Sequence, residues 1–207
     1  MNHTTVLTTE RLELVVGSPE MLRAAANDRQ RFSQLLNAIV TDDWPHEFLD
    51  DALIPMAELM EQEARDGVER GIFTFWFILL KEPRTLIGTA GFKAPPSDTS
   101  AAPSGNSNQA AAQVEIEAGR ADIGYGLVKS HQRKGYAREA VQRLLQAAFE
   151  NSLVTTVVGE TLEDLTASIR VMESCGFHRV STGGTGYSGE ENVIRYDLPR
   201  ADWEARL

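Results

Sequence analysis

The sequence predicts an α/β fold in which helices pack on the faces of one mixed β-sheet. Runs rich in β-branched and aromatic residues alternate with stretches of helical periodicity. Their order is a strand, helices, a strand meander and then a strand–helix–strand–helix–strands series, which is typical of a mixed sheet. With 207 residues and 42% hydrophobic content, the chain is expected to form a single domain over residues 1–207.

The chain is predicted to begin with a strand and two helical stretches. Residues 11–16 alternate as a strand does, and Ser18 followed by Pro19 predicts the start of a helix that runs through about Asn27. The second helical stretch places four apolar residues on one face, namely Phe32, Leu35, Leu36 and Ile39.

A third helix and a strand hairpin are predicted next. Pro45 interrupts the helical pattern, which resumes over residues 56–65 and stops near Gly67. Residues 73–80 and 86–92 are two apolar runs joined by a turn that contains proline, so we expect a hairpin.

Residues 94–113 consist mainly of Pro, Ser, Ala, Asn and Gly, with little to bury. They are predicted to form a mobile insertion loop within the domain, and both a tolerated insertion and a substrate lid are open interpretations.

The second half of the chain is predicted to alternate strands and helices. Residues 161–164 offer capping side chains for a helix that ends at Cys175, where Gly176 suits a left-handed C-cap. The expected elements are strand 122–128, helix 138–150, strand 154–160, helix 165–175, and an antiparallel pair of strands, 177–181 and 192–198.

The most informative stretch is the basic loop that opens the helix at residue 138. No Ser, Thr, Asp or Asn stands at the cap position, so several backbone N–H groups lack an obvious partner. Gly135 permits close backbone approach, and four cations fall within ten residues, namely Lys129, Arg133, Lys134 and Arg138. Together these features predict a phosphate site at a helix N-terminus. The alternative is a surface turn with solvated basic side chains.

Two nucleotide-binding motifs are excluded at this loop. Gly124 and Gly126 could begin a dinucleotide fingerprint, but Lys129 occupies the position of the third glycine. The chain also contains no G-x-x-x-x-G-K-[ST] sequence, so a nucleoside-triphosphate loop is not expected.

Gln132-x-x-Gly135-x-Ala137, placed between a strand and a helix, resembles the pyrophosphate loop of GCN5-related N-acetyltransferases (GNAT), [RQ]-x-x-G-x-[GA]. Flanking segments resemble the branch of this superfamily that acetylates ribosomal-protein N-termini. The resemblance covers about residues 10–198 and is strongest over 121–177. The segments that carry it are Asp122-Ile123-Gly124-Tyr125, residues 139–149, Glu160-Thr161, residues 168–172 and Cys175-Gly176-Phe177.

The resemblance implies the GNAT fold, with a mixed, mostly antiparallel sheet that splays at the cofactor site and is flanked by helices on both faces. Acetyl-CoA would lie in the splay, and one amide N–H near Leu127 would polarise its thioester carbonyl. The backbone of three residues, Leu127, Val128 and Lys129, would pair with pantetheine. The remaining cofactor-binding residues implied are Gln132, Arg133, Lys134, Gly135, Tyr136, Ala137 and Ser168.

For catalysis, the resemblance makes Asp122 the first candidate for the general base or amine anchor, with Glu115 and Glu117 as fallbacks. A solvated carboxylate is the alternative interpretation of all three. Ser168 would bond the cofactor or relay a proton, although a plain helix serine is the competing interpretation.

The chain departs from the family pattern at two positions. Leu165 replaces an Asn of the N-x-x-S pattern, and the turn before Gly176-Phe177 lacks the Tyr that often serves as the leaving-group acid. Cys175 is expected to be a packing residue and His131 a solvated loop residue. The segment with Trp44, Pro45, His46 and Phe48 would wall the acceptor side or simply anchor the core.

Composition and apolar patterning argue against a nucleic-acid-binding, disulfide-bonded, cysteine–zinc or membrane-spanning protein. The net charge of −10 argues against nucleic-acid binding through a basic face, and one cysteine allows neither an internal disulfide nor a cysteine-based zinc site. No signal peptide is recognised, and the longest apolar run, residues 72–80, is too short to span a bilayer. We therefore expect a cytoplasmic protein with no metal and no membrane partner.

The resemblance implies an acetyl-CoA-dependent N-acetyltransferase that acts by direct transfer to a primary amine. No nucleophile elbow or Cys–His pairing suggests a covalent route. A protein N-terminal α-amine and a small amine or polyamine are both open as acceptors, and a homodimer is left open. The alternative from another class is a catalytically silent CoA-binding or regulatory module.

Overall fold

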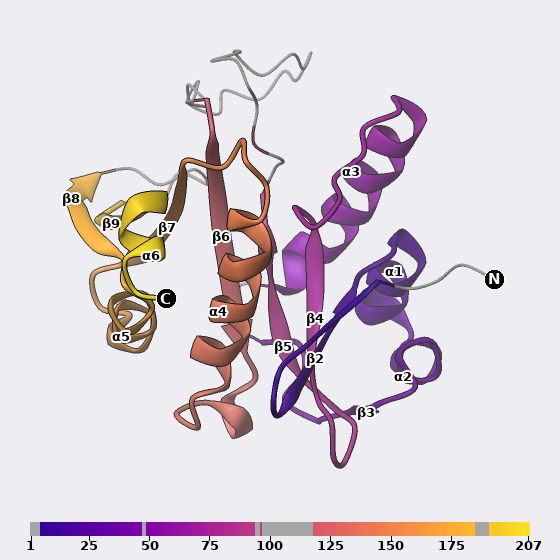
Figure 1. The fold of residues 1–207 in the computed structure, drawn as a ribbon. Coiled ribbons are helices and arrows are strands. Elements are labelled where there is room, and N and C mark those ends of the chain that lie inside the picture. The colour runs from indigo at the N-terminus through magenta and orange to yellow at the C-terminus, as the bar shows by residue number, and fades with distance from the viewer. Residues whose placement is uncertain (1–4, 47–48, 94–95, 97–117, 185–190) are drawn as a thin grey trace. The chain divides into compact units, whose positions relative to one another are not determined.

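The computed structural model describes residues 5–46, 49–93, 96, 118–184 and 191–207 (Figure 1). The chain divides into two compact units. The first comprises Met1–Gly91 and Tyr125–Arg143, and the second comprises Phe92–Gly124 and Leu144–Leu207. The predicted insertion loop at 94–113 lies outside the described residues except for Pro96, and the prediction of one domain stays a prediction.

An antiparallel sheet forms the centre of the first unit. Its strands follow the order β1, β2, β4, β5, and the short β3 pairs with β5 in parallel. The strand bounds are β1 (Val6–Thr8), β2 (Leu12–Val16), β3 (Ile39–Val40), β4 (Phe75–Leu80) and β5 (Thr85–Phe92). The hairpin of β4 and β5 was predicted, whereas β1 was not.

The helices of the first unit are α1 (Pro19–Asn27), α2 (Arg29–Leu36), η1 (Asp50–Ala52), α3 (Leu53–Arg65) and η2 (Lys129–His131), followed by the start of α4 (Tyr136–Phe149). Helix α1 begins where predicted, since the Ser18 hydroxyl accepts the N–H of Met21 at 3.2 Å. The prediction that Ile39 lies on the apolar face of the second helix was wrong. Asn37 adopts a left-handed conformation (φ 48°) that ends α2, so Ile39 enters β3 and is 55% exposed.

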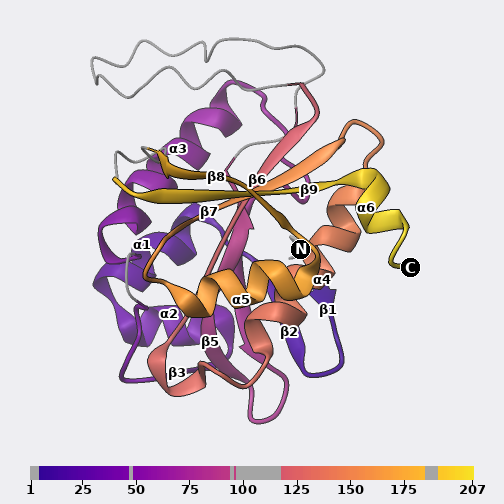
Figure 2. The same ribbon diagram turned by 90° about the vertical axis from the view of Figure 1, so that its left-hand side faces the viewer.

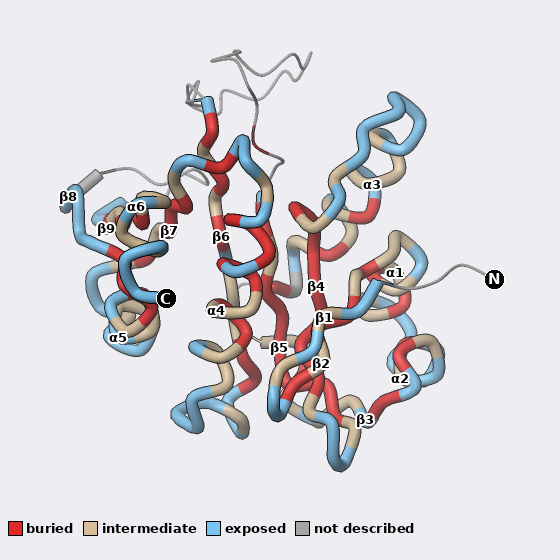
Figure 3. Tube along the Cα trace, in the orientation of Figure 1, coloured by how far each residue is buried: buried red, intermediate tan, exposed pale blue. Residues whose placement is uncertain are grey.

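Aromatic side chains fill the core of this unit. The Phe32 ring lies 5.1 Å from the ring of Phe77 and 5.6 Å from that of Trp44, measured between centroids. Strand β4 is buried along nearly its whole length, as the red segment in Figure 3 shows. Trp44 is therefore a core anchor, which was one of the two interpretations of that residue.

In the described part of the second unit, the strands of the sheet follow the order β6, β7, β9, β8. Their bounds are β6 (Arg120–Leu127), β7 (Thr156–Leu162), β8 (His178–Gly184) and β9 (Val193–Pro199). Strand β6 pairs with β7 in parallel, and the other pairings are antiparallel; β8 and β9 lie side by side in Figure 2. The β6–β7 ladder ends at Ile123 and Gly159 although both strands continue, so pairing stops where the expected splay would begin.

Two further helices belong to the second unit, α5 (Thr166–Cys175) and α6 (Arg200–Glu204). The capping prediction for α5 was wrong, because Thr161 lies buried within β7 and the N-cap residue is Leu165, which has no capping side chain. Gly176 does take the predicted left-handed C-cap conformation, with φ 97°. Helix α6 was not predicted.

The predicted α/β fold is confirmed. In the described part of the chain, the strands are mostly antiparallel, with parallel pairing only between β3 and β5 and between β6 and β7. In the first unit, helices α1–α3 lie on one side of the sheet and the start of α4 on the other, as Figures 1 and 2 agree. None of the described helices has the length and apolar character needed to cross a membrane.

Candidate functional site

The basic loop leaves the last part of β6 in the first unit. There the chain runs tightly against β5, because the N–H of Val128 donates to the carbonyl of Ile87 at 2.9 Å. Gly88 makes this approach possible, since a Cβ at that position would lie 2.2 Å from the carbonyl oxygen of Gly126. Helix η2 follows, and the chain then passes through residues 132–135 into α4.

The start of α4 presents a row of unpaired backbone donors. The first helical hydrogen bond runs from the N–H of Glu139 to the carbonyl of Gly135 at 3.1 Å, and Gly135 has no side chain to cap the amides of the first turn that follows it. Within the described residues, five N–H groups have no acceptor: those of Arg133, Lys134, Gly135, Tyr136 and Ala137. These donors sit at the positive end of the helix dipole, so they suit an anion.

Left-handed backbone shapes this row of donors. Arg133 has φ 64° and Gly135 has φ 82°, so two residues of the loop lie in the left-handed region on either side of Lys134. Such local changes of hand turn successive N–H groups toward a common concave side, where a phosphate group is held in many proteins. Gly135 is the residue that adopts this conformation without strain.

Three hydrogen bonds brace the loop from the side of β6 and η2. The N–H of Ser130 donates to Asp43 Oδ2 at 2.8 Å. The side chain of Gln132 donates to the carbonyl of Leu127 at 3.0 Å, and Lys134 Nζ donates to the carbonyl of Ser130 at 3.0 Å. The motif residue Gln132 therefore holds the loop closed with its side-chain amide.

Asp43 is ionised at neutral pH. Burial alone would raise the pKa of this carboxyl, but the hydrogen bonds it accepts, chiefly from the Ser130 N–H, lower the pKa to about 2. The pKa of His131 is also lowered, first by burial and then by the charge of Lys134, against the opposing charge of Asp43. His131 is half-buried with Nδ1 2.9 Å from Ser130 Oγ, so it is tied into the turn rather than simply solvated.

The opposite side of the loop is held by Arg11, from the turn between β1 and β2. Its Nη1 donates to the carbonyl of Lys134 at 3.1 Å, and its guanidinium lies 4.5 Å from the centre of the Tyr136 ring. Its Nε and Nη2 both reach Oε2 of Glu139, at 2.7 and 2.6 Å. Sequence reasoning missed Arg11 because 128 positions separate it from Glu139.

His46, which the resemblance would place on the acceptor side, also lies in the first unit. A Cβ on Gly126 would fall 2.3 Å from the His46 ring, so the imidazole lies directly against the backbone of β6. Its Nε2 is 2.7 Å from Thr89 Oγ1 on β5, so that ring nitrogen already has a hydrogen-bond partner. Phe48, the other aromatic side chain named with it, lies outside the described residues.

The carboxylate candidate Asp122 lies in the second unit. It is half-buried on β6, opposite Val158 of β7, and its carbonyl accepts the N–H of Lys93 at 3.0 Å. Strand alternation puts its side chain on the same face as that of Arg120, which approaches Asp197 to 3.7 Å. The fallback candidates at 115 and 117 lie outside the described residues.

Ser168 lies in the first turn of α5, also in the second unit. It is half-buried, and its N–H donates to the carbonyl of Leu165 at 2.9 Å. Cys175 is buried at the end of the same helix, as expected of a packing residue.

Tyr196 was not singled out from the sequence. It lies on β9, and its hydroxyl donates to Glu173 of α5 at 3.4 Å. Burial and the charge of Glu173 raise its pKa, so the phenol stays protonated.

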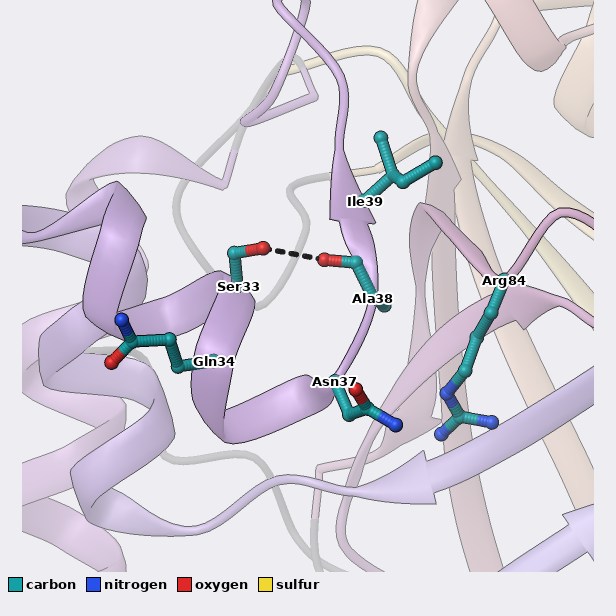
Figure 4. Close-up of a pocket in the computed structure, with 6 residues that line it drawn as sticks. All are labelled: Ser33, Gln34, Asn37, Ala38, Ile39 and Arg84. Carbon is teal, nitrogen blue, oxygen red and sulfur yellow. Dashed lines mark hydrogen bonds between the residues drawn. The ribbon is translucent and has the colours of Figure 1, made fainter.

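A separate hollow lies at the end of α2 and contains none of the loop residues. Figure 4 shows the six residues that line it, Ser33, Gln34, Asn37, Ala38, Ile39 and Arg84. Arg84 is its only charged side chain and is paired with Glu13, while the Ser33 hydroxyl donates to the carbonyl of Ala38 at 2.6 Å. The hollow therefore offers no acid, base or nucleophile that is free for chemistry.

Comparison with known proteins identifies the family. Residues 19–178 match the model of the acetyltransferase (GNAT) domain. The chain belongs to the GNAT family of acetyltransferases. Among curated proteins, this GNAT chain is similar to the uncharacterized N-acetyltransferase YjdG of Bacillus subtilis strain 168, with 26% identity over 172 residues, which cover 83% of this chain and 89% of YjdG.

Solved structures show the same fold at low identity. One is the ribosomal L7/L12 α-N-protein acetyltransferase RimL in complex with coenzyme A, with a TM-score of 0.61 and 16% identity, covering 94% of this chain and 98% of that one. Another is the spermidine N-acetyltransferase of Vibrio cholerae with CoA and spermine, with a TM-score of 0.61 and 14% identity, covering 95% and 99% of the two chains. As a GNAT protein, the chain is an acetyl-CoA-dependent acetyltransferase.

Proposed function

We propose that this GNAT enzyme transfers the acetyl group of acetyl-CoA directly to a primary amine, and that its preferred acceptor is a protein N-terminal α-amine. The observation that carries the proposal is the row of five unpaired amides at residues 133–137, which fits the doubly charged pyrophosphate of CoA. Lys129 and Arg133 are exposed beside this row and add positive charge in a chain of net charge −10.

The proposed cofactor contacts extend back along the chain from this row. The backbone groups of Leu127 and Lys129 are the preferred contacts for pantetheine. Val128 is less suited, because its N–H already donates to the carbonyl of Ile87. Ser168 is proposed as a further contact from α5. Bound acetyl-CoA supplies a thioester carbonyl that is open to attack by an amine.

Proton handling is proposed for three side chains. A primary amine is mostly protonated near neutral pH, so a group on the acceptor side must take up its proton before transfer. We assign this role first to Asp122 and place Ser168 as a relay. The structure adds His46 as a candidate, because its imidazole lies against Gly126, one residue before Leu127.

The choice of acceptor follows from the weakness of these bases. An N-terminal α-amine has a pKa of about 7.7–8.0, while an alkylamine such as a lysine side chain has one of about 10.4. A carboxylate is a weak base, and it suits the more easily deprotonated α-amine. The similarity in fold to RimL points the same way, whereas that to the spermidine enzyme makes polyamines the competing acceptor.

Calorimetry with acetyl-CoA, followed by turnover on an amine panel, tests the proposal. The wild-type protein should bind acetyl-CoA, and Gly135→Glu should abolish binding by filling the loop with a negative side chain. Peptides with a free N-terminus should be acetylated at a higher kcat/KM than spermidine. Absence of binding, or binding with no turnover on any amine, would contradict the proposal, and the second result would favour a silent CoA-binding module.

Asp122→Asn tests the assignment of the base. It should lower kcat by about a hundredfold or more, the usual contribution of general base catalysis, and leave the affinity for acetyl-CoA unchanged. Asp164→Asn, an exposed carboxylate of the same unit, is the matched control and should leave kcat unchanged. If Asp122→Asn keeps full activity while His46→Gln loses it, the base is His46.

A further inference from the structure

Two side chains of the turn between β1 and β2 donate to Glu139 of α4, and one of them, that of Arg11, also reaches the candidate cofactor loop. Thr9, Arg11 and Glu139 form this cluster, hereafter the Thr9–Arg11–Glu139 clamp. All three residues lie in the first unit, and no role in the proposed chemistry has been given to them above.

Every nitrogen of the Arg11 guanidinium is committed to the loop and helix start. Nε and Nη2 hold one oxygen of Glu139 at 2.7 and 2.6 Å, and Nη1 holds the Lys134 carbonyl at 3.1 Å. The guanidinium carbon lies over the Tyr136 ring. A lysine could not make these contacts together, because its ammonium is a single point of charge.

The bond to the Lys134 carbonyl fixes the direction of a cofactor-binding donor. That carbonyl and the N–H of Gly135 belong to one planar trans peptide, so they point in opposite directions. Because Arg11 holds the oxygen on its own side, the N–H of Gly135 is turned to the opposite side of the loop. Arg11 therefore aims one of the five free donors without occupying its binding position.

Glu139 is charged and is held within the same cluster. Its Oε1 accepts from the Thr9 hydroxyl at 2.6 Å and from the Arg11 N–H at 2.9 Å, and its side chain is only 18% exposed. Burial acts to raise its pKa, but these bonds and the Arg11 charge outweigh burial and lower it. Without Arg11, this carboxylate would place an uncompensated negative charge in the first turn of the helix that is proposed to bind an anion.

We propose that the Thr9–Arg11–Glu139 clamp is a positioning unit for the CoA pyrophosphate loop. It orients the Lys134–Gly135 peptide before the cofactor arrives and cancels the charge of Glu139 at the helix start. This inference rests on the proposed function, since it assigns the clamp to the same anion site.

Steady-state kinetics with two acetyl donors tests the clamp. Arg11→Ala should raise KM for acetyl-CoA roughly tenfold, as expected for the loss of a charge-assisted contact, and should leave kcat at saturation nearly unchanged. S-acetylpantetheine carries the thioester without the pyrophosphate, so its KM should be the same for Arg11→Ala and wild type. Adding Glu139→Gln to Arg11→Ala should restore part of the acetyl-CoA affinity, because it removes the uncompensated charge.

Arg23→Ala is the matched control. Arg23 also pairs with a glutamate in the first unit and is exposed to a similar extent, 41% against 43% for Arg11, so its loss should change neither KM. If Arg11→Ala is poorly folded, Arg11→Lys and Glu139→Gln give the same comparison of the two donors. An equal rise in KM for both donors, or no rise for either, would overturn the inference. Failure of the wild-type protein to bind acetyl-CoA would instead overturn the proposed function.

Discussion

Helices α1 and α4 begin in opposite ways, and both helix starts lie in the first unit. At α1, the Ser18 hydroxyl accepts the N–H of Met21 and Pro19 contributes no N–H, so side-chain chemistry completes the helix start. At α4, Gly135 has no side chain and five successive N–H groups have no acceptor in the described part of the chain. The protein itself caps the start of α1, whereas the amides at the start of α4 remain open for the proposed binding of the pyrophosphate.

The open start of α4 is tolerated because tertiary packing holds the helix. Its apolar stripe is fully buried at Ala140, Leu144 and Leu145, so the helix does not depend on a cap for its stability. The basic side chains and the clamp at Arg11 then hold the open amides in place. Helix α5 also lacks a capping side chain, so a missing cap alone does not mark a site; α4 differs in its five successive amides without an acceptor in the described part of the chain and in the basic side chains beside them.

The largest effect is expected from a substitution of Gly135, the residue that directly precedes α4. Gly135→Ala should lower affinity for acetyl-CoA by roughly a hundredfold, because the loop must leave its left-handed conformation and several donors lose their aim. The strain should also cost about 1–2 kcal/mol in the free energy of unfolding. Calorimetry and chemical denaturation measure the two effects separately.

Gly67→Ala is the matched control for backbone strain. Gly67 is also left-handed, with φ 74°, and a Cβ there meets nothing within 4 Å. It should show a similar loss of stability and no loss of acetyl-CoA affinity. If the two variants had equal affinities for acetyl-CoA, the start of α4 would have no special part in binding the cofactor.

A smaller effect is expected at the closed start of α1. Ser18→Ala should lower the free energy of unfolding by about 1 kcal/mol, since it leaves the Met21 N–H without its cap. Acetyl-CoA affinity should not change. Saturating CoA should stabilise Ser18→Ala and the wild-type protein by the same amount. Thermal denaturation with and without CoA measures this; a CoA-dependent rescue specific to Ser18→Ala would contradict the account.

The last effect depends on pH and concerns Asp43, which accepts the N–H of Ser130 just before the open amides. Its pKa is lowered to about 2 from 3.8, so the stabilisation it gives is fully present above about pH 4 and is lost as the pH falls toward 2. The difference in unfolding free energy between wild type and Asp43→Asn should therefore shrink over that interval. A difference that stays constant from pH 6 to pH 2 would show that the carboxylate charge is not what holds the turn.

Local chemistry made most of the fold predictable. Ser18-Pro19 fixed the start of α1, and Gly176 marked the end of α5, because caps depend on residues adjacent in sequence. Ile39 was wrongly predicted to lie on the apolar face of the second helix. Asn37 ends that helix directly after Leu36 by adopting a left-handed conformation, which helical periodicity does not reveal. The short elements β1 and α6 escaped detection because three- and five-residue elements carry little periodic signal.

The candidate site was predictable only where its residues are contiguous. The spacing of Gln132, Gly135 and Ala137 indicated the loop, and the missing cap indicated its open donors. The contacts from Arg11 to Lys134 and from Asp43 to Ser130 join positions 123 and 87 residues apart, so only the fold brings them together. The roles of Asp122 and Ser168 stay predictions.

The most direct test of the central claim is an NMR titration of the backbone amides with CoA and with pantetheine. CoA should shift the amide resonances of residues 133–137 strongly, and pantetheine should leave them nearly unchanged. The capped amide of Met21 should respond to neither compound. Amides 133–137 that are indifferent to CoA, or that respond equally to pantetheine, would contradict the claim that this helix start binds the pyrophosphate.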